Sequence, residues 1–511
     1  MLKSNVLKIA LFATGLAGIV AEYVLSTLAT YFLGNAVIQW TMIVSIMLFS
    51  MGLGSRISKV FKENLLQKFI LIEFTLSFFS AFSALFVYTI AAFTSYTGVI
   101  IYLLCIIIGL LIGMEIPLVI RLNSSYQTLK VNVSSVLEQD YYGSLAGGVF
   151  FAFVGLPILG LTYTPFILGT VNFLVAVGLI AILWGEITSR LKKQLSIASS
   201  SIAVILLIGF FVSQPIILFG EQKRYQDKII YSEQTKYQKI VLTQWQDDYW
   251  LYINNNQQLS TLDEVMYHEP LVHPVMTLHP NPTNILVLGG GDGCAVREIL
   301  KYPDVEKITL VDLDPAMTEL GLTHPVLTKL NNNALNNEKV SILNEDGFIF
   351  MEQSKEFYDV VIVDLPDPNT VELNQLYTQE FYSLIHRKLR PNGLLITQAG
   401  SPYFATKAYL CIDKTMASAG FATQKLHNQI VTLGEWGWVL GIKNDSIQLK
   451  EKLLSLQFDE VETKWINNEA MSLMTSFGKN IYVEKVGDIE VNRIHNPVLY
   501  RYYLKGNWDL Y

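Results

Sequence analysis

Cysteine is scarce in this chain of 511 residues, which contains only Cys105, Cys294 and Cys411. No two of the three lie close in sequence, so the pattern indicates neither a cysteine-based metal site nor a redox pair. A disulfide framework is not expected either. We predict a protein with no bound metal ion and no permanently bound cofactor.

Charged side chains are also scarce over residues 1–220, which hold 11 Lys and Arg and 7 Asp and Glu. Residues 221–511 hold 26 and 37, so the two parts carry net charges of +4 and −11. An acidic surface repels nucleic acid, which argues against a nucleic-acid partner for the second part. The same charge suits a cationic substrate.

Long apolar runs occupy the charge-poor part. The hydrocarbon layer of a bilayer is about 30 Å thick, so a spanning helix needs roughly 20 apolar residues. The first run contains Glu22, is too long for a signal peptide and is followed by further runs, so we predict that it is retained. A transmembrane domain over 1–220 is predicted, with about seven spans at 6–33, 37–55, 68–93, 98–120, 143–160, 164–185 and 199–219.

Two carboxylates inside these runs, Glu22 and Glu115, are candidates for function. A carboxylate in lipid is costly and indicates a functional site by default. Glu115 stands beside Pro117 and before Arg121, so the alternative for it is a side chain that reaches the head groups from a helix end.

The sequence changes character after residue 220, where short runs of alternating polar and apolar residues begin. Residues 239–243 and 250–253 are typical of strands, and the asparagines at 254–256 are typical of a turn. We predict a small β-rich domain at 221–262.

Strands then alternate with helices over 263–445, followed by a C-terminal extension at 446–511. The alternation predicts a parallel, doubly wound sheet of the Rossmann-like, methyltransferase type, which binds ligands at the carboxyl ends of its strands. The predicted strands are 284–288, 307–311, 340–343, 360–363 and 393–398. Four acids follow strands directly: Asp292, Asp312, Asp346 and Asp364.

The glycine turn after the first of these strands indicates a nucleoside ligand. Gly289 and Gly291 are followed by Ala295, so the Gly-x-Gly-x-x-Gly spacing of dinucleotide sites is absent. Asp312, about 20 residues further on, is placed to hold a ribose diol. Together these residues favour an S-adenosyl donor.

Asp292 lies inside the glycine turn, where the amino-acid tail of S-adenosylmethionine would bring its carboxylate. Two carboxylates there would repel each other, and more so when desolvated. A tail that has lost its carboxylate keeps only an ammonium group, which an aspartate would bind well. Asp292 therefore favours decarboxylated S-adenosylmethionine as co-substrate.

Asp364 and Asp367 place two carboxylates on one loop after the fourth strand. Such a pair can bind a diamine cation and accept its proton. The alternative is a pair of solvated loop acids or a helix cap, which the position after a strand disfavours.

Three stretches resemble the spermidine synthase family. They are 287–293 with Val296-Arg297-Glu298, then 309–314, and the upstream residues Gln258-Leu259-Ser260, Asp263-Glu264, Tyr267-His268-Glu269 and His273-Pro274. Lys236-Tyr237-Gln238 is similar to the start of that domain, and the resemblance covers about 229–442. With the apolar part in front, the chain is identified as a member of the membrane-bound branch. The family's tyrosine before Trp436-Gly437 is absent, with Val431 or Thr432 in its place.

The resemblance implies a role for each site residue. Gln238, Gln258, Asp312, Asp346 and Gly347 would hold the thioadenosine, and Asp292 the aminopropyl ammonium. Tyr267, His268, Asp367 and Gln398 would line the diamine site, and Asp364 would accept the proton. The resemblance also implies a homodimer formed through the β-rich domain.

The leading hypothesis is aminopropyl transfer to a diamine such as putrescine, giving spermidine and methylthioadenosine. The alternatives are an S-adenosylmethionine-dependent methyltransferase and a membrane transporter or sensor whose soluble domain only binds polyamine.

Two arguments about topology disagree. The basic loops between spans, such as 56–68 and 190–193, place the N-terminus in the cytoplasm and, after seven spans, the soluble domain outside. The donor is a cytosolic metabolite, and unpaired cysteines suit a reducing compartment. We expect a multi-pass cell-membrane protein with a cytoplasmic catalytic domain.

Overall fold

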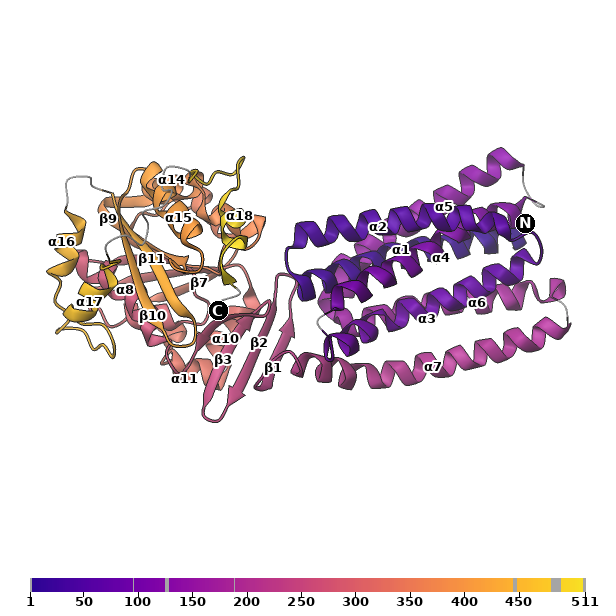
Figure 1. Cartoon of the computed structure of the whole chain (residues 1–511), viewed down its shortest axis with the longest axis horizontal. Coiled ribbons are helices and arrows are strands. Elements are labelled where there is room, and N and C mark those ends of the chain that lie inside the picture. Colours follow the sequence, from indigo (N-terminus) through magenta and orange to yellow (C-terminus); the bar gives the residue numbers. More distant parts are fainter. Residues whose placement is uncertain are drawn as a thin grey trace. The chain divides into compact units, whose positions relative to one another are not determined.

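The computed structural model describes residues 2–94, 96–124, 128–187, 189–443, 448–478 and 489–508. The chain forms two compact units, Met1–Ile229 and Ile230–Tyr511 (Figure 1). Each unit is described by itself. The predicted boundary at 445 lies outside the described residues.

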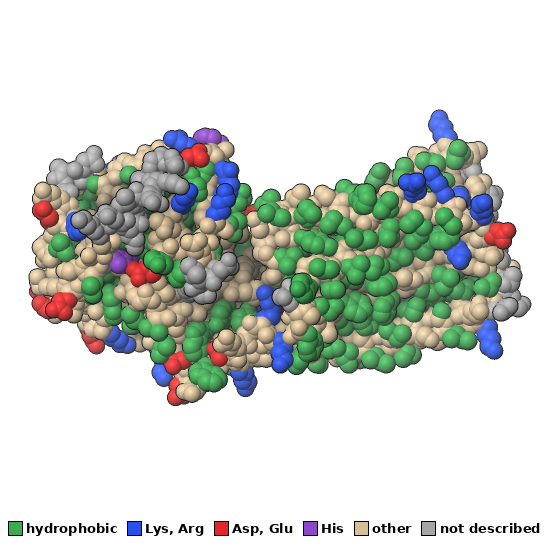
Figure 2. All heavy atoms as spheres, in the orientation of Figure 1, with side chains coloured by type: hydrophobic (Ala, Val, Ile, Leu, Met, Phe, Trp, Pro, Cys, Tyr) green, Lys and Arg blue, Asp and Glu red, His purple; other side chains and the backbone are tan. Residues whose placement is uncertain are grey.

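The first unit is a bundle of long apolar helices. Within the described residues, six of its helical runs are long and apolar enough to cross a membrane. Large apolar side chains point outward, among them Leu48, Phe49 and Phe211, which are 60–71% exposed. Figure 2 shows apolar side chains covering the visible face of these helices, as expected for a surface that faces lipid. The helices are α1 (Leu2–Leu33), α2 (Ala36–Ile57), α3 (Leu65–Ala91), α4 (Thr97–Asn123), α5 (Leu129–Phe150), α6 (Gly160–Ile182) and α7 (Ser189–Gln222), with a π-helical segment, Phe151–Leu159, between α5 and α6.

The fifth apolar run, Leu129–Ile182, is 54 residues long, about twice the length that a bilayer requires. Gly160 interrupts it with a backbone φ of 63°. On the α5 side, Gly143 packs against Phe12 of α1 and Gly148 against Tyr23, so α5 runs parallel to α1.

Beyond Gly160 the chain runs the other way. The Ser77 hydroxyl of α3 donates to the Gly169 carbonyl of α6, and the Phe74 and Phe173 rings lie 6.1 Å apart. Helix α6 therefore runs antiparallel to α3. The Thr14–Glu73 hydrogen bond and the Tyr31–Tyr88 ring contact show that α3 runs parallel to α1. Leu129–Ile182 thus traverses the bundle twice. Its two arms correspond to the predicted spans 143–160 and 164–185, although the helix of the first begins earlier, at Leu129.

Glycines bring the helices of the bundle into close contact. A Cβ on Gly113 of α4 would lie 2.1 Å from the Met51 carbonyl oxygen of α2, and a Cβ on Gly143 of α5 would lie 2.0 Å from the Phe12 carbonyl oxygen of α1. These two pairs of helices therefore pack backbone to backbone, as small residues allow in membranes.

Four carboxylates of the helical unit are buried among the described residues: Glu22, Glu73, Glu115 and Glu221. Glu73 accepts a hydrogen bond from the Thr14 hydroxyl at 3.2 Å. Glu115 is fully buried, and neither of its oxygens has a hydrogen-bond partner among the described residues. The expectation that Glu115 reaches outward from a helix end is wrong, because the side chain lies inside the bundle.

The second unit begins with a four-stranded antiparallel sheet, β1 (Lys228–Gln234), β2 (Lys239–Trp245), β3 (Asp248–Ile253) and β4 (Asn256–Ser260). The two strands predicted here are β2 and β3. Asn254 and Asn255 both have positive φ, the backbone of a two-residue hairpin turn. Ile240 and Leu251 pack against Met317 and Leu320 of the next layer, which fixes this sheet on the larger one.

The larger sheet has seven strands in the order β10-β11-β9-β8-β5-β6-β7. Five are parallel and confirm the predicted strands: β5 (Asn284–Gly289), β6 (Lys307–Asp312), β7 (Val340–Asn344), β8 (Tyr358–Asp364) and β9 (Leu389–Gly400). Two antiparallel strands that the sequence did not predict, β10 (Ala422–Ile430) and β11 (Gly434–Ile442), extend the sheet beyond β9. The switch point between β5 and β8 is therefore central.

Helices cover this sheet. They are α8 (Val265–Leu278), α9 (Cys294–Ile299), α10 (Pro315–Thr323), α11 (Pro325–Leu330), α12 (Gly347–Gln353), α13 (Val371–Asn374), α14 (Gln379–Lys388) and α15 (Thr406–Ser418). The C-terminal residues add α16 (Leu449–Leu454), α17 (Asn468–Met474) and α18 (Leu499–Leu504).

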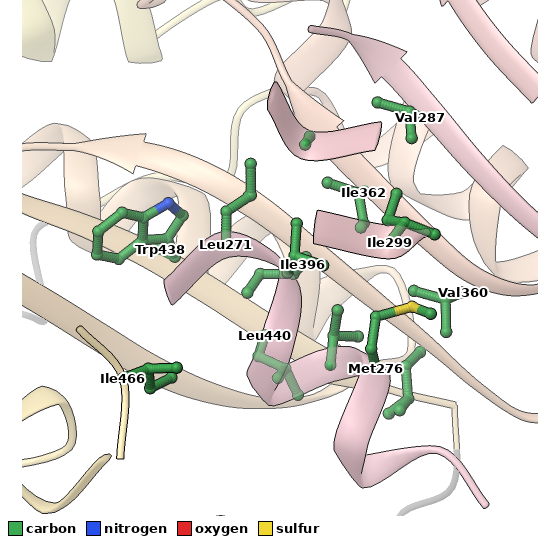
Figure 3. Close-up of a cluster of buried hydrophobic side chains, with 14 of the residues drawn as sticks. Leu271, Met276, Val287, Ile299, Val360, Ile362, Ile396, Trp438, Leu440 and Ile466 are labelled. Carbon is green, nitrogen blue, oxygen red and sulfur yellow. The ribbon is translucent and has the colours of Figure 1, made fainter. Parts of the chain in front are cut away.

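The C-terminal extension is part of the core of this unit. Ile466 belongs to the same buried cluster as Leu271 of α8 and Trp438 and Leu440 of β11 (Figure 3). The Glu269 carboxylate of α8 accepts hydrogen bonds from the backbone N–H groups of residues 464–466.

Candidate active site

One pocket at the carboxyl ends of the parallel strands brings together all eleven residues that the sequence predicts for the site. Its walls come from β4, α8, the loops after β5, β6, β7 and β8, and the end of β9. The pocket is therefore where the doubly wound sheet should bind a ligand. The predicted residues in its lining are Gln238, Gln258, Tyr267, His268, Asp292, Asp312, Asp346, Gly347, Asp364, Asp367 and Gln398.

The glycine turn after β5 is packed directly against the end of β8. Gly289 has a φ of 83°, and a Cβ there would lie 2.0 Å from the Asp364 carbonyl oxygen. The Gly290 N–H donates to the same oxygen at 3.0 Å. Only glycine fits this conformation and this approach. The turn thereby brings Asp292 and Asp364 to the same part of the pocket.

Asp364 lies partly exposed in the pocket wall. The Tyr267 hydroxyl donates to its Oδ1 at 2.7 Å. Desolvation raises the pKa of the Asp364 carboxyl to about 6, with the positive charge of His268 and the Tyr267 hydrogen bond acting against that rise and the nearby Asp292 adding to it. At neutral pH the group is an anion, but a more basic one than an aspartate in water.

His268 is held as a cation behind Asp364. Its Nδ1 donates to the Glu264 carboxylate at 2.8 Å, and its Nε2 lies 3.8 Å from Asp292 Oδ1. Burial alone would lower the pKa of His268, but the charges and hydrogen bond of Glu264, with Asp292 and Asp364, raise it to about 9.

Glu264 is fixed in turn by Arg297, whose two terminal nitrogens lie 2.8 and 2.9 Å from its oxygens. Although burial opposes ionisation, His268 and Arg297 lower the pKa of Glu264 to about 2. The Glu264–His268–Arg297 group is thus a charged support for the pocket at neutral pH.

His268, Asp292 and Asp364 could together hold a metal ion by their spacing alone. A protonated imidazole has no lone pair to offer a metal, and this one is stabilised as imidazolium. A metal ion would therefore have to displace this proton, and the expected absence of a metal stays a prediction.

Asp367 lies at the other side of the same loop. The Tyr503 hydroxyl donates to its Oδ2 at 2.6 Å, and Gln398 Nε2 lies 3.3 Å from its Oδ1. Burial raises the pKa of Asp367 to about 6 against the effect of these two donors. Gln398 is itself fixed by the Tyr377 hydroxyl and the Leu365 carbonyl.

The predicted donor side is built from the loops after β5 and β6. Asp312 Oδ1 accepts the Asp314 N–H at 2.9 Å, and burial raises the pKa of Asp312 to about 6. A Cβ on Gly291 would lie 2.8 Å from Asp312 Oδ2, so a side chain at 291 would fill the predicted ribose site. Asp292 Oδ1 accepts the Cys294 N–H at 2.8 Å.

Asp346 has a structural task as well. Its Oδ1 caps α12 by accepting the N–H groups of Phe348 and Ile349 at 2.8 and 3.1 Å. Gly347 begins the same helix, so the placement of these two predicted thioadenosine residues depends on the cap.

Sequence reasoning missed Tyr503, because nothing in the local sequence of the C-terminal extension links it to the loop after β8. It also left open which residue stands in place of the family's tyrosine. Val431 is 69% exposed, and Thr432 is bound to Asp263 at 3.0 Å; neither lines the pocket.

The doubly wound sheet has an acid after its second strand, another in its glycine turn and two more after the adjoining strand. These features define a class: transferases that move a group from an adenosyl-sulfonium donor to a cationic acceptor. Residues 264–452 match the Spermine/spermidine synthase domain family. The chain belongs to this family of polyamine aminopropyltransferases.

Full-length relatives carry the same conclusion. Polyamine aminopropyltransferase 2 of Aquifex aeolicus (strain VF5) is 42% identical over 507 residues, which cover 98% of this chain and 99% of that protein. Polyamine aminopropyltransferase of Leptospira interrogans is 39% identical over 490 residues, with 95% of each chain covered. The resemblance therefore includes the apolar helices as well as the catalytic unit. A solved spermidine synthase in complex with the transition-state analogue AdoDATO is 26% identical, with a TM-score of 0.43, and covers 49% of this chain and 85% of that chain.

Proposed function

We propose that the protein transfers the aminopropyl group of decarboxylated S-adenosylmethionine to a diamine such as putrescine, giving spermidine and methylthioadenosine. The observation that carries the proposal is the acid inside the glycine turn, Asp292, close to the acid pair Asp364 and Asp367 in one pocket. A tail that ends in an ammonium group complements Asp292, whereas a tail with a carboxylate is repelled by it.

The donor would lie along the carboxyl ends of β5, β6 and β7. Asp312 would hold the ribose hydroxyls, Gln238 and Gln258 the thioadenosine from the small sheet, and Asp346 with Gly347 the adenine edge. Binding of the aminopropyl ammonium by Asp292 would direct the methylene carbon next to sulfur toward Asp364.

The acceptor would lie between the two acids of the β8 loop. Asp367 would hold the far ammonium group of the diamine, with Gln398 behind it. The near nitrogen would lie at Asp364, beside Tyr267 and His268. This arrangement selects an acceptor with two cationic ends.

The near nitrogen must lose a proton before it can attack, since an alkyl ammonium has a pKa of ~10 in water, by analogy with lysine. Burial lowers the pKa of an ammonium and raises that of a carboxyl, so the transfer to Asp364 is less uphill than in water. The free amine then forms a bond to the methylene carbon as the carbon–sulfur bond breaks. The sulfonium takes the electron pair and leaves as neutral methylthioadenosine.

The test is a product assay. Purified full-length protein is incubated with decarboxylated S-adenosylmethionine or with S-adenosylmethionine, each with putrescine, cadaverine or spermidine, and the products are identified by mass spectrometry. We expect an aminopropylated amine only from the decarboxylated donor. A methylated product would establish the methyltransferase alternative, and binding without any product would favour the transporter or sensor.

The apolar unit would anchor the enzyme in the cell membrane as a multi-pass protein. Leu7, Val119 and Leu183 share one cluster at the end of the bundle where the basic connections lie, whereas Arg224 stacks on the Tyr31 ring at the other end. The N-terminus and the exit of α7 are therefore at opposite ends of the bundle. The positive-inside rule would place the exit outside, but the supply of donor requires a cytoplasmic catalytic unit, which we propose.

A C-terminal fusion reporter tests this orientation. A fluorescent protein fused after residue 511 should be fluorescent and alkaline phosphatase at the same position inactive; the reverse result would place the catalytic unit outside. We also propose a homodimer, which light scattering of the purified protein would detect as twice the chain mass.

A further inference from the structure

Tyr503 in α18 reaches the candidate acceptor site from a part of the chain outside the family domain, whose match ends at residue 452. We propose that Tyr503 is a positioning residue that sets acceptor specificity: its hydroxyl fixes the Asp367 carboxylate so that it can bind the far ammonium group of a diamine. This inference rests on the proposed function and assigns part of the acceptor site to the C-terminal segment.

The contact itself is short and direct. The Tyr503 hydroxyl donates to Asp367 Oδ2 at 2.6 Å, within the range for a hydrogen bond to a charged oxygen. The Tyr503 ring lies beside Gly400 at the end of β9, where a Cβ would meet it at 3.7 Å. Tyr503 is not among the residues that line the pocket, so it supports Asp367 from behind.

The start of α18 is tied to the same network. The Asn492 Oδ1 accepts the N–H groups of Val498 and Leu499, and its Nδ2 donates to the Tyr377 carbonyl at 3.0 Å. The Tyr377 hydroxyl is the partner of Gln398, which contacts Asp367. Asn492 is fully buried, so this link is part of the fold rather than a surface contact.

The end of α18 is fixed by Trp508. Its indole N–H donates to the Tyr503 carbonyl at 2.8 Å, and the two ring centroids are 4.6 Å apart. The neighbouring Asn507 N–H donates to the Phe404 carbonyl, which ties this segment to the loop before α15. Tyr503 is therefore held at both ends of its helix, as a residue that must orient another side chain should be.

A phenol suits this task for a chemical reason. It donates one hydrogen bond and carries no charge, so Asp367 keeps a full negative charge for the substrate. A lysine or arginine at 503 would instead neutralise Asp367 and compete with the diamine. Burial raises the pKa of Asp367 to about 6, and the Tyr503 hydrogen bond opposes that rise because it favours the ionised carboxylate.

The test is Tyr503→Phe, which removes the hydroxyl and keeps the ring against Trp508. Tyr502→Phe is the matched control, because its hydroxyl contacts the Glu490 backbone and not the pocket. We expect Tyr503→Phe to raise the KM for putrescine about tenfold, the size of one hydrogen bond to a charged group, with kcat changed less than about threefold and the KM for the donor unchanged.

Four further measurements separate positioning from folding. The preference for putrescine over butylamine, which lacks the far ammonium, should shrink in Tyr503→Phe, and the pH at which the KM for putrescine rises should move upward. In an Asp367→Asn background, Tyr503→Phe should add nothing, since both changes act on one interaction. Calorimetry of putrescine binding with methylthioadenosine present gives the same comparison without turnover.

The outcomes distinguish this inference from the proposed function. A wild-type enzyme that forms no aminopropyl product would overturn the function. An active wild type with an unchanged putrescine KM in Tyr503→Phe, or with additive effects of the two substitutions, would overturn the role of Tyr503 alone.

Discussion

The two units of the molecule bury carboxylates in different ways. In the catalytic unit, Glu264 has Arg297 and His268, and Glu298 has His273 and Lys301. Burial opposes ionisation of both acids, but these partners lower the pKa of each to about 2. In the helical unit, Glu115 is equally buried and has no hydrogen-bond partner among the described residues.

The difference separates carboxylates that already have charged partners from those that do not. The oxygens of a carboxylate such as Glu264 already bond to charged partners and are not available to a substrate. Asp364 and Asp367 have neutral donors at short distance, and desolvation raises the pKa of each to about 6. Each of these two carboxylates could bind one cation, and a diamine supplies two.

Loss of a buried carboxylate that is paired with charged side chains should have the largest effect on stability. Glu264→Gln removes the carboxylate that pairs with both Arg297 and His268; Arg297 then keeps Glu298 at 2.7 Å, and His268 keeps Asp292 at 3.8 Å. Breaking a buried pair in this way costs about 3–5 kcal/mol. Denaturant unfolding of the catalytic unit, followed by tryptophan fluorescence, should show that loss.

The same pair makes a pH prediction with a definite sign. Because the folded-state pKa of Glu264 lies below its usual value, the stabilisation is complete above about pH 4.5 and is lost as the pH falls toward 2. The unfolding midpoint of Glu264→Gln should therefore depend less on pH across this window than that of the wild type. Equal slopes would show that the pair is not ionised in the folded protein.

Loss of a pocket acid whose hydrogen-bond donors are neutral should lower turnover and leave folding intact. Asp364→Asn removes the predicted proton acceptor, and general bases contribute about 10²–10⁴-fold. We expect turnover to fall at least about 10²-fold with donor affinity largely kept, measured by steady-state kinetics and calorimetry. Near-normal turnover would exclude Asp364 from this role.

The wild-type enzyme should also lose activity in acid. Asp364 and Asp367 both have a pKa of about 6, so each becomes protonated as the pH falls below that value. A protonated Asp364 cannot accept a proton, and a protonated Asp367 cannot bind an ammonium group. The value of kcat/KM for the diamine should fall from pH 7 to pH 5; a flat profile would contradict the assignment of both acids.

Asp292 should have a smaller effect, on the choice of donor. The wild type should bind decarboxylated S-adenosylmethionine more tightly than S-adenosylmethionine in calorimetry. Asp292→Asn removes both the attraction for ammonium and the repulsion of carboxylate, so the ratio of the two affinities should shrink about tenfold, as expected for one charged contact. Equal affinities in the wild type would favour the methyltransferase alternative.

The smallest effect is expected in the helical unit. Glu115→Gln keeps the shape of the side chain and removes a carboxyl group whose oxygens have no hydrogen-bond partner among the described residues. The free energy of unfolding should stay the same or rise by about 1 kcal/mol, in contrast to Glu264→Gln. Thermal unfolding of the full-length protein in detergent would measure both. A large loss of stability in Glu115→Gln would show that this carboxyl has a partner after all.

Sequence alone predicted the long apolar helices, the five parallel strands and the acids that follow those strands. The period and length of the apolar runs gave the long helices, because a spanning helix needs a fixed length of apolar residues. The alternation of strands and helices gave the parallel sheet, and in such a sheet every strand ends at the same edge. Asp292, Asp312, Asp346 and Asp364 therefore had to meet, although no distance between them could be known.

Only the tertiary structure decided contacts between residues that are far apart in the chain. The sequence predicts two spans, 143–160 and 164–185, on either side of the turn at Gly160, but only the tertiary structure decides which helices the two arms pack against. The hydroxyl that donates a hydrogen bond to Asp367 belongs to Tyr503, 136 residues away in sequence. The sequence around a tyrosine looks the same on a surface helix as at an active site. The position of Tyr503 is set by the packing of the buried residues Asn492 and Leu499, which places its helix.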